Sequence, residues 1–132
     1  MNFEGFNNPK SALRAMTERL KALVDARESE RFSLALSGGG TAKEMFALWA
    51  AEYAKKITWR SVRFFWVDER CVPPGSEESN FGEADRLFFR PMGIDPENVF
   101  RIRGEDDPQP ESERYSALAR EMTETPGSIP DF

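Results

Sequence analysis

The sequence contains no histidine and only one cysteine, Cys71. Histidine is the commonest general base and the commonest zinc ligand, so its absence rules out most structural zinc sites. A single cysteine excludes an internal disulfide and is typical of proteins from a reducing compartment. We therefore expect a chain without a metal site.

The chain also lacks long apolar runs and an excess of positive charge. No run approaches the length of about 18 apolar residues that marks a membrane span, and Met1–Gly5 lacks the basic start of a secretory signal. The chain has 18 basic and 23 acidic residues, which gives a net charge of −5. This charge argues against a broad nucleic-acid surface, although a few basic side chains could still hold a small anion. The expectation is a cytoplasmic protein with no membrane or nucleic-acid partner, of unknown oligomeric state.

The most informative stretch is Leu34–Ala42, where a short apolar run breaks into three glycines. The chain is 39% hydrophobic with 11 Phe, which predicts one folded domain over residues 1–132. Phe32–Leu36 is typical of a buried strand and Ala42–Lys55 of a helix, so the glycines form a strand-to-helix turn. Glycine lets a ligand approach the backbone, and the start of the helix favours an anion.

Two familiar nucleotide motifs do not fit this turn. A P-loop requires a Lys-Ser or Lys-Thr pair after its second glycine, and the chain has none there. A dinucleotide fingerprint starting at Gly38 would need a glycine where Lys43 stands, and an acidic partner about 20 residues further on. The first carboxylate at the end of a strand, Asp68, lies well beyond that distance. A glycine-rich connection without any ligand stays open as an alternative.

Polar residues also follow the next strand of the pattern. Val62–Val67 combines β-branched and aromatic residues, which predicts a strand, and strand, helix and strand together form a parallel βαβ unit. The carboxyl ends of both strands then share one edge of the sheet, where open α/β folds bind their ligands. Asp68–Arg70 lies at that edge, together with the glycine turn.

The remaining segments predict one more strand and three more helices. An amphipathic helix begins at Asn8–Pro9, a short helix covers Glu83–Phe89 and stops at Pro91, and a final helix begins at Pro108 or Pro110 and closes at Pro126–Gly127. Val99–Ile102 predicts a third strand. Ile129–Phe132 resembles the approach to another strand, so we expect the chain to be the N-terminal part of a longer α/β domain.

Three motifs resemble those of one enzyme family. They are Leu36–Thr41, Phe64–Pro74 and Glu78–Gly82, in that order, and they resemble the 6-phosphogluconolactonases. These enzymes are grouped with the glucosamine-6-phosphate deaminases, which carry Asp-Glu-Tyr where this chain has Asp68-Glu69-Arg70. The resemblance implies a Rossmann-like parallel sheet flanked by helices. It also implies hydrolysis of 6-phospho-D-glucono-1,5-lactone to 6-phosphogluconate in the oxidative pentose phosphate pathway, without a metal or organic cofactor.

The resemblance further implies roles for particular residues. Arg70 would stabilise negative charge on the lactone oxygens, and Asp68 would orient water or Arg70. Members of the family continue into an Asp-Gly-His motif whose histidine acts as the general base, and this chain does not contain it. The expected substrate-binding residues are those of the glycine turn and of the third motif: Ser37, Gly38, Gly39, Gly40, Thr41, Asn80 and Gly82.

Simpler interpretations remain for several of these side chains. Asp68 and Arg70 could form an ion pair that stabilises the loop, and Asn80 could cap the following helix. Strand alternation directs Glu69 away from its two neighbours, which favours a structural role. Cys71 lacks a histidine partner, which argues against a nucleophilic thiol. Two alternative functions stay open. The chain could belong to another sugar-phosphate isomerase or deaminase of the same fold, or it could be an inactive fragment that binds phosphosugars.

Overall fold

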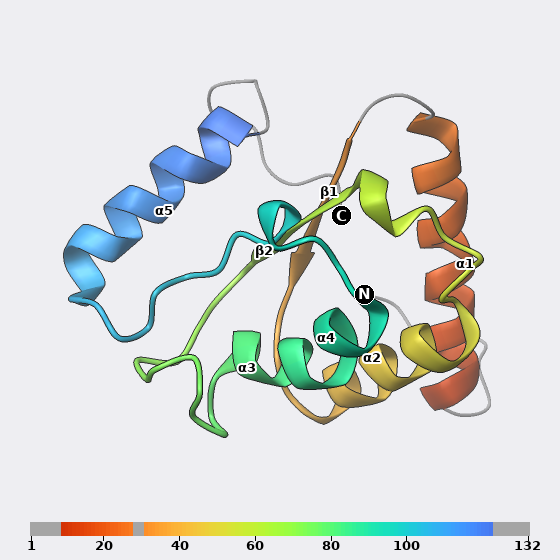
Figure 1. The fold of residues 1–132 in the computed structure, drawn as a ribbon, viewed down its shortest axis with the longest axis horizontal. Coiled ribbons are helices and arrows are strands. Elements are labelled where there is room, and N and C mark those ends of the chain that lie inside the picture. Colours follow the sequence, from red (N-terminus) through yellow and green to blue (C-terminus); the bar gives the residue numbers. More distant parts are fainter. Residues whose placement is uncertain (1–8, 28–30, 123–132) are drawn as a thin grey trace.

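The computed structural model describes residues 9–27 and 31–122, in which two short parallel strands lie between helices (Figure 1). None of the helices in these two ranges combines the length and hydropathy that crossing a membrane requires. In chain order the elements are α1 (Pro9–Arg27), β1 (Phe32–Leu36), α2 (Gly40–Glu52), η1 (Trp59–Ser61), β2 (Val62–Trp66), α3 (Asn80–Ala84), η2 (Asp85–Phe89), α4 (Arg90–Met92), η3 (Pro96–Asn98) and α5 (Pro108–Met122).

The predicted βαβ unit is confirmed. Strands β1 and β2 pair in parallel, in register from Phe32 opposite Val62 to Leu36 opposite Trp66, with α2 as the crossover. Two strands alone make a small sheet, so most of its stability has to come from the helices that cover it. Figure 1 shows α1 and α5 on opposite sides of the two strands.

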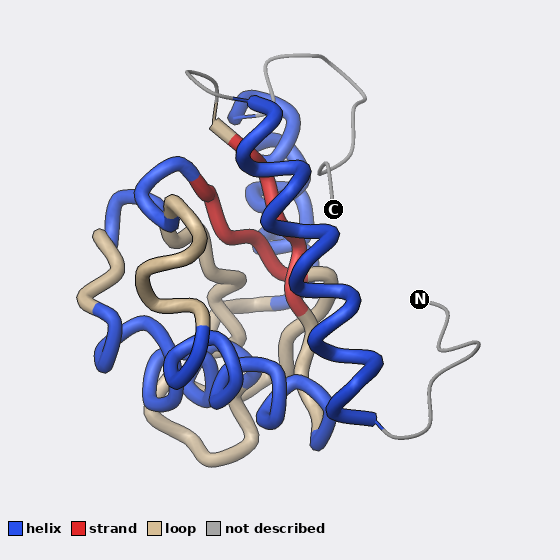
Figure 2. The backbone as a smooth tube through the Cα atoms, turned by 90° about the vertical axis from the view of Figure 1, so that its right-hand side faces the viewer, coloured by secondary structure: helices blue, strands red, loops and turns tan. Residues whose placement is uncertain are grey.

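The hydrophobic core lies on the sheet face that α1 and α2 cover. Alternate side chains of both strands enter it, as the two-residue period of a strand requires, and Figure 2 shows α1 running alongside the strands. Trp49 and Phe88 lie at its centre with ring centroids 5.3 Å apart. Aromatic rings that meet edge to face in this way stabilise a core beyond the area they bury. The strand residues of the core are Phe32, Leu34, Leu36, Val62, Phe64 and Trp66.

The predicted third strand is reduced to a single bridge. Phe64 pairs in parallel with Val99, and Phe100 N–H donates to the Phe64 carbonyl at 2.9 Å. Further along, the Tyr115 hydroxyl stands between the two segments: it accepts from Trp66 N–H at 2.8 Å and donates to the Phe100 carbonyl at 2.5 Å. The ladder ends because a side chain from α5 takes the backbone partners that another strand would use.

Pro91 does not stop the helix after Glu83, contrary to the prediction. Helical residues run from Asn80 to Met92 through α3, η2 and α4, and Pro91 lies inside the last of these. Proline lacks an N–H and crowds the preceding turn, and here the preceding turn is the wider π-helical turn of η2, which ends at Phe89. The helix ends instead at Gly93, whose φ of 65° is left-handed. Glycine adopts this conformation without strain.

The two outer helices agree with their predictions. α1 begins at Pro9 and buries Leu13, Leu20 and Val24, and α5 begins at Pro108. The predicted end of the last helix at Pro126–Gly127 and the segment Ile129–Phe132 lie outside the described residues.

Candidate active site

The strands end side by side, as predicted from the βαβ pattern. Val67 N–H donates to the Leu36 carbonyl at 2.8 Å, one residue beyond the paired strands. The glycine turn therefore leaves β1 at the same edge where Asp68–Arg70 leaves β2. This arrangement is the one that open parallel sheets use to bind ligands.

The glycine turn forms the start of α2. Gly39 is the N-cap with φ of 107°, a value that only glycine adopts readily, and it offers no side chain to the first helical N–H groups. Those N–H groups are left without a side-chain cap, in the orientation that binds anions at helix starts. Ser37, Gly40 and Thr41 are exposed beside them.

Asn80 connects the glycine turn to Asp68. Its side chain lies against Gly38, and its Nδ2 donates to the Asp68 carbonyl at 3.2 Å, with Asp68 Oδ1 at 3.5 Å. Asn80 is buried, with 8% of its surface exposed. These contacts place Asn80 between the two halves of the edge.

The helix cap after the loop is Ser79 and not Asn80. Ser79 Oγ accepts from Gly82 N–H at 3.0 Å, and Asn80 is the first helical residue. Gly82 packs so tightly on the loop that an added Cβ would overlap the Pro74 carbonyl oxygen. This glycine therefore allows the loop and the helix start to pack together.

Asp68 and Arg70 both expose their side chains. Within the described ranges no ion pair joins the two residues, so the loop-stabilising pair is not formed. Arg70 N–H donates to Glu69 Oε1 at 2.8 Å, and the Arg70 carbonyl packs on Gly104, where a Cβ would overlap it. The backbone of Arg70 is therefore held in place while the residue itself is exposed.

Three neighbours of this edge were missed by the sequence reasoning. Lys43, in the first turn of α2, lies with Nζ 3.9 Å from Oε2 of Glu83. Glu83 is 8% exposed, and its Oε1 has no hydrogen-bond partner in the described part of the chain. Ser79 directly precedes a helix and could have been found from cap preferences alone, whereas the pairing of Lys43 with Glu83 has no sequence signal.

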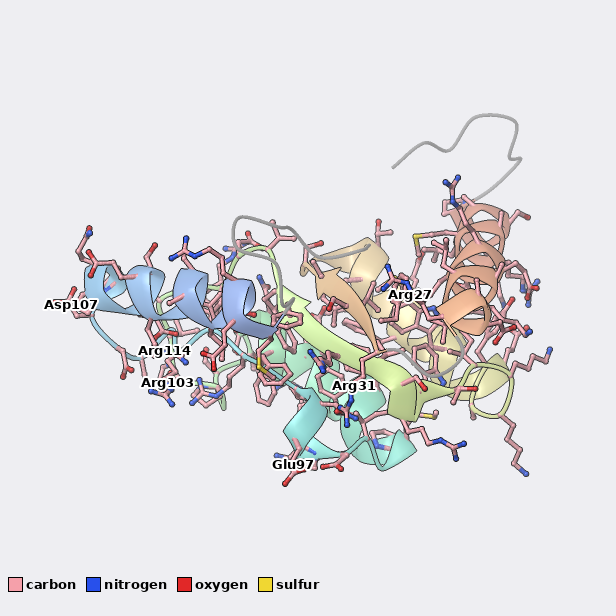
Figure 3. All side chains as sticks on the ribbon, turned by 90° about the horizontal axis from the view of Figure 1, so that it is seen from above. Arg27, Arg31, Glu97, Arg103, Asp107 and Arg114 are labelled. Atoms are coloured by element: carbon pink, nitrogen blue, oxygen red, sulfur yellow. The ribbon has the colours of Figure 1, made fainter. Side chains whose placement is uncertain are left out.

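A second set of charges fastens α5 to the loop behind the site. Glu111 accepts from Arg114 Nε at 2.5 Å and from Arg103 N–H at 2.6 Å; Figure 3 shows Arg103 and Arg114 close together beside α5. The hydrogen bond from Arg114 holds the pKa of Glu111 below its ordinary value. Burial raises the pKa of the Tyr115 hydroxyl. Residues 9–27 and 31–122 contain no group of three or more His, Cys, Asp or Glu placed to hold a metal ion.

Comparison with known proteins identifies the family of the chain. The sequence pattern of the family described as glucosamine-6-phosphate isomerases/6-phosphogluconolactonase matches residues 7–132. A 6-phosphogluconolactonase of Treponema pallidum (strain Nichols) is 44% identical over 105 residues, which are 78% of this chain and 44% of the relative. A 6-phosphogluconolactonase of Haemophilus influenzae is 35% identical over 116 residues, which are 87% of this chain and 49% of the relative.

A solved structure gives the same result. The crystal structure of devB protein superposes with a TM-score of 0.82 at 35% identity, covering 88% of this chain and 48% of that chain. The chain thus spans about half the length of the relatives it matches. These matches confirm the resemblance carried by the three motifs and the predicted α/β fold with its parallel sheet. The chain belongs to the glucosamine-6-phosphate isomerase/6-phosphogluconolactonase family.

Proposed function

We propose that this chain takes part in hydrolysing 6-phospho-D-glucono-1,5-lactone to 6-phosphogluconate. One observation supports the proposal most strongly: the glycine turn and Asp68–Arg70 follow adjacent parallel strands, and Asn80 contacts both Gly38 and Asp68. A single phosphosugar can touch both only if they share one edge. The relatives that bear the name 6-phosphogluconolactonase support the choice of substrate.

The substrate anchor in this proposal is the glycine turn. The first N–H groups of α2 and the hydroxyls of Ser37 and Thr41 donate to phosphosugar oxygens, and Lys43 adds a positive charge in the same turn of the helix. Backbone N–H groups at a helix start bind anions without a dedicated basic residue. Binding of this kind orients the lactone ring towards the end of β2.

The chemical step in this proposal uses Arg70 and Asp68. Water adds to the lactone carbonyl carbon, and the carbonyl oxygen becomes an oxyanion. The carbonyl then re-forms as the ring C–O bond breaks; one proton of the water ends on the released ring oxygen as a hydroxyl, and the other is lost to solvent as the carboxylate forms. The Arg70 guanidinium stabilises the oxyanion, and Asp68 orients the water or the arginine. The 132 residues contain no histidine, so we expect them alone to turn over lactone about 10² to 10⁴ times more slowly than a site with a positioned base, or not at all.

Binding and turnover should be measured separately to test the proposal. Calorimetric titration of the chain with 6-phosphogluconate should show binding, and Arg70→Ala should weaken it or lower kcat/KM of the complete protein by about 10² to 10³. Arg19→Ala removes an exposed arginine from α1 and serves as the matched control. Normal kcat/KM in Arg70→Ala would overturn the role given to Arg70.

A second candidate function is isomerisation or deamination of an amino-sugar phosphate, because the family description includes glucosamine-6-phosphate isomerases. Parallel assays of the complete protein with 6-phosphogluconolactone and glucosamine 6-phosphate separate the two. Turnover of only the amino sugar would replace the lactonase proposal. Binding of 6-phosphogluconate without turnover of either substrate would support a phosphosugar-binding role.

A further inference from the structure

Glu69 lies between the two segments that carry the proposed site. Its Oε1 accepts from Arg70 N–H at 2.8 Å and from Asn80 N–H at 2.7 Å. Its Oε2 accepts from Phe81 N–H at 2.9 Å and from Ser79 Oγ at 3.1 Å. One side chain therefore fastens the residues after β2 to the start of α3, ten to twelve positions further along the chain.

Only a carboxylate can satisfy this arrangement. Four donors converge on two oxygens, and an ionised carboxylate has acceptor sites for all of them, whereas a glutamine amide offers one oxygen and presents two N–H donors to the others. Hydrogen bonds to an ionised acceptor are also roughly twice as strong as neutral ones. The position therefore demands Glu for its charge and for both oxygens.

Through these hydrogen bonds Glu69 is connected to the groups that would bind the substrate. Asn80, held by Oε1, packs on Gly38 of the anion-binding turn and donates to Asp68. Arg70, held by the same oxygen, exposes its guanidinium. A shift of either backbone by even about 1 Å would misplace a group that stabilises charge, and such misplacement costs about 10² in rate.

We infer that Glu69 is a positioning residue of the site, setting the placement of Arg70 and Asn80 while making no contact with substrate. The inference rests on the proposed function for its kinetic readout. Both carboxylate oxygens are already engaged by the protein, which distinguishes Glu69 from a general base. The structural role predicted for Glu69 is thus to hold Arg70 and Asn80 in place.

The kinetic test compares Glu69→Gln with Glu77→Gln in the complete protein. Glu77 is an exposed acid of the same loop and is the matched control for loss of charge. Glu69→Gln should lower kcat, per folded molecule, by about 10² with KM changed by less than about threefold, because it displaces the charge-stabilising group more than the anchor. A kcat within about twofold of the parent protein, at a temperature where both are folded, would overturn the inference.

A second measurement is independent of catalysis. Amide hydrogen exchange at Asn80 and Phe81 should become about 10-fold faster or more in Glu69→Gln and stay unchanged in Glu77→Gln, since the acceptor of both N–H groups is altered. If the parent protein neither binds 6-phosphogluconate nor turns over lactone, the proposed function fails, and this exchange result still decides the positioning role. Unchanged exchange at both amides would overturn it.

Discussion

The backbone of Gly38 lies directly against the side-chain amide of Asn80, and any Cβ at position 38 would overlap Asn80 Oδ1. Asn80 is buried and donates to Asp68, so its amide cannot move aside without breaking that contact. Gly38 is therefore required for space. Gly39, by contrast, is required for its φ of 107°, and a Cβ added there would meet no atom of residues 9–27 or 31–122 within 4 Å. Adjacent glycines of one turn thus serve different physical needs.

Gly38→Ala should lower the free energy of unfolding by about 1–3 kcal/mol, the usual cost of forcing a methyl group into a packed site. It should also weaken 6-phosphogluconate binding, because the glycine turn and Asn80 must separate. Urea unfolding and calorimetric titration measure the two effects. Gly75→Ala is the control for stability, since its added Cβ meets nothing within 4 Å in the part of the chain that the structure describes. Parental stability and affinity in Gly38→Ala would contradict the tight contact.

Tyr115→Phe should destabilise the chain by about 2 kcal/mol, because it leaves the Trp66 N–H and the Phe100 carbonyl without their shared partner. Chemical denaturation measures the change. Tyr53→Phe is the matched control: its hydroxyl donates to the exposed Glu18 at 2.7 Å, and the loss should stay below about 1 kcal/mol. Equal losses in both variants would argue that the Tyr115 hydroxyl is not the link between α5 and the sheet.

Alkaline titration should reveal late ionisation of both tyrosines. Burial, aided by Glu18, raises the pKa of Tyr53 to about 12, and burial raises the pKa of Tyr115 as well. The folded state therefore keeps its phenolic protons where the unfolded state loses them, so stability should fall as pH rises above the ordinary value of 10.0. Ultraviolet absorbance of tyrosinate measures this. Ionisation of either tyrosine near its ordinary pKa in the folded chain would refute the prediction.

Glu111→Gln should destabilise the chain at neutral pH by about 2 kcal/mol, since it removes a charged acceptor from Arg114 and Arg103. The folded-state pKa of Glu111 is lowered from 4.5, so its stabilising effect is complete above that value and is lost as pH falls through the folded-state value. The stability gap between parent and variant should shrink as the solution is acidified below about pH 5. Glu113→Gln, on the exposed side of α5, should show a small and constant gap.

Several parts of the fold and site were predicted because they depend on neighbouring residues in the sequence. The aromatic and β-branched run Val62–Val67 predicts a strand, and the glycine turn with its following helix predicts the parallel crossover. The error at the third strand occurs because a distant residue competes for the same backbone groups. Val99–Ile102 has the composition of a strand, yet Tyr115 takes the partners that its ladder would need.

By itself the sequence determined the outer helices α1 and α5, the parallel βαβ unit and the shared edge that carries the glycine turn and Asp68–Arg70. These follow from local periodicity and from the handedness of crossovers, which act over short stretches of chain. Only the tertiary structure decided that Asn80 packs on Gly38 and that Glu69 gathers donors from two segments. Such contacts join residues far apart in the chain, and their geometry arises only when the packed elements bring those residues together.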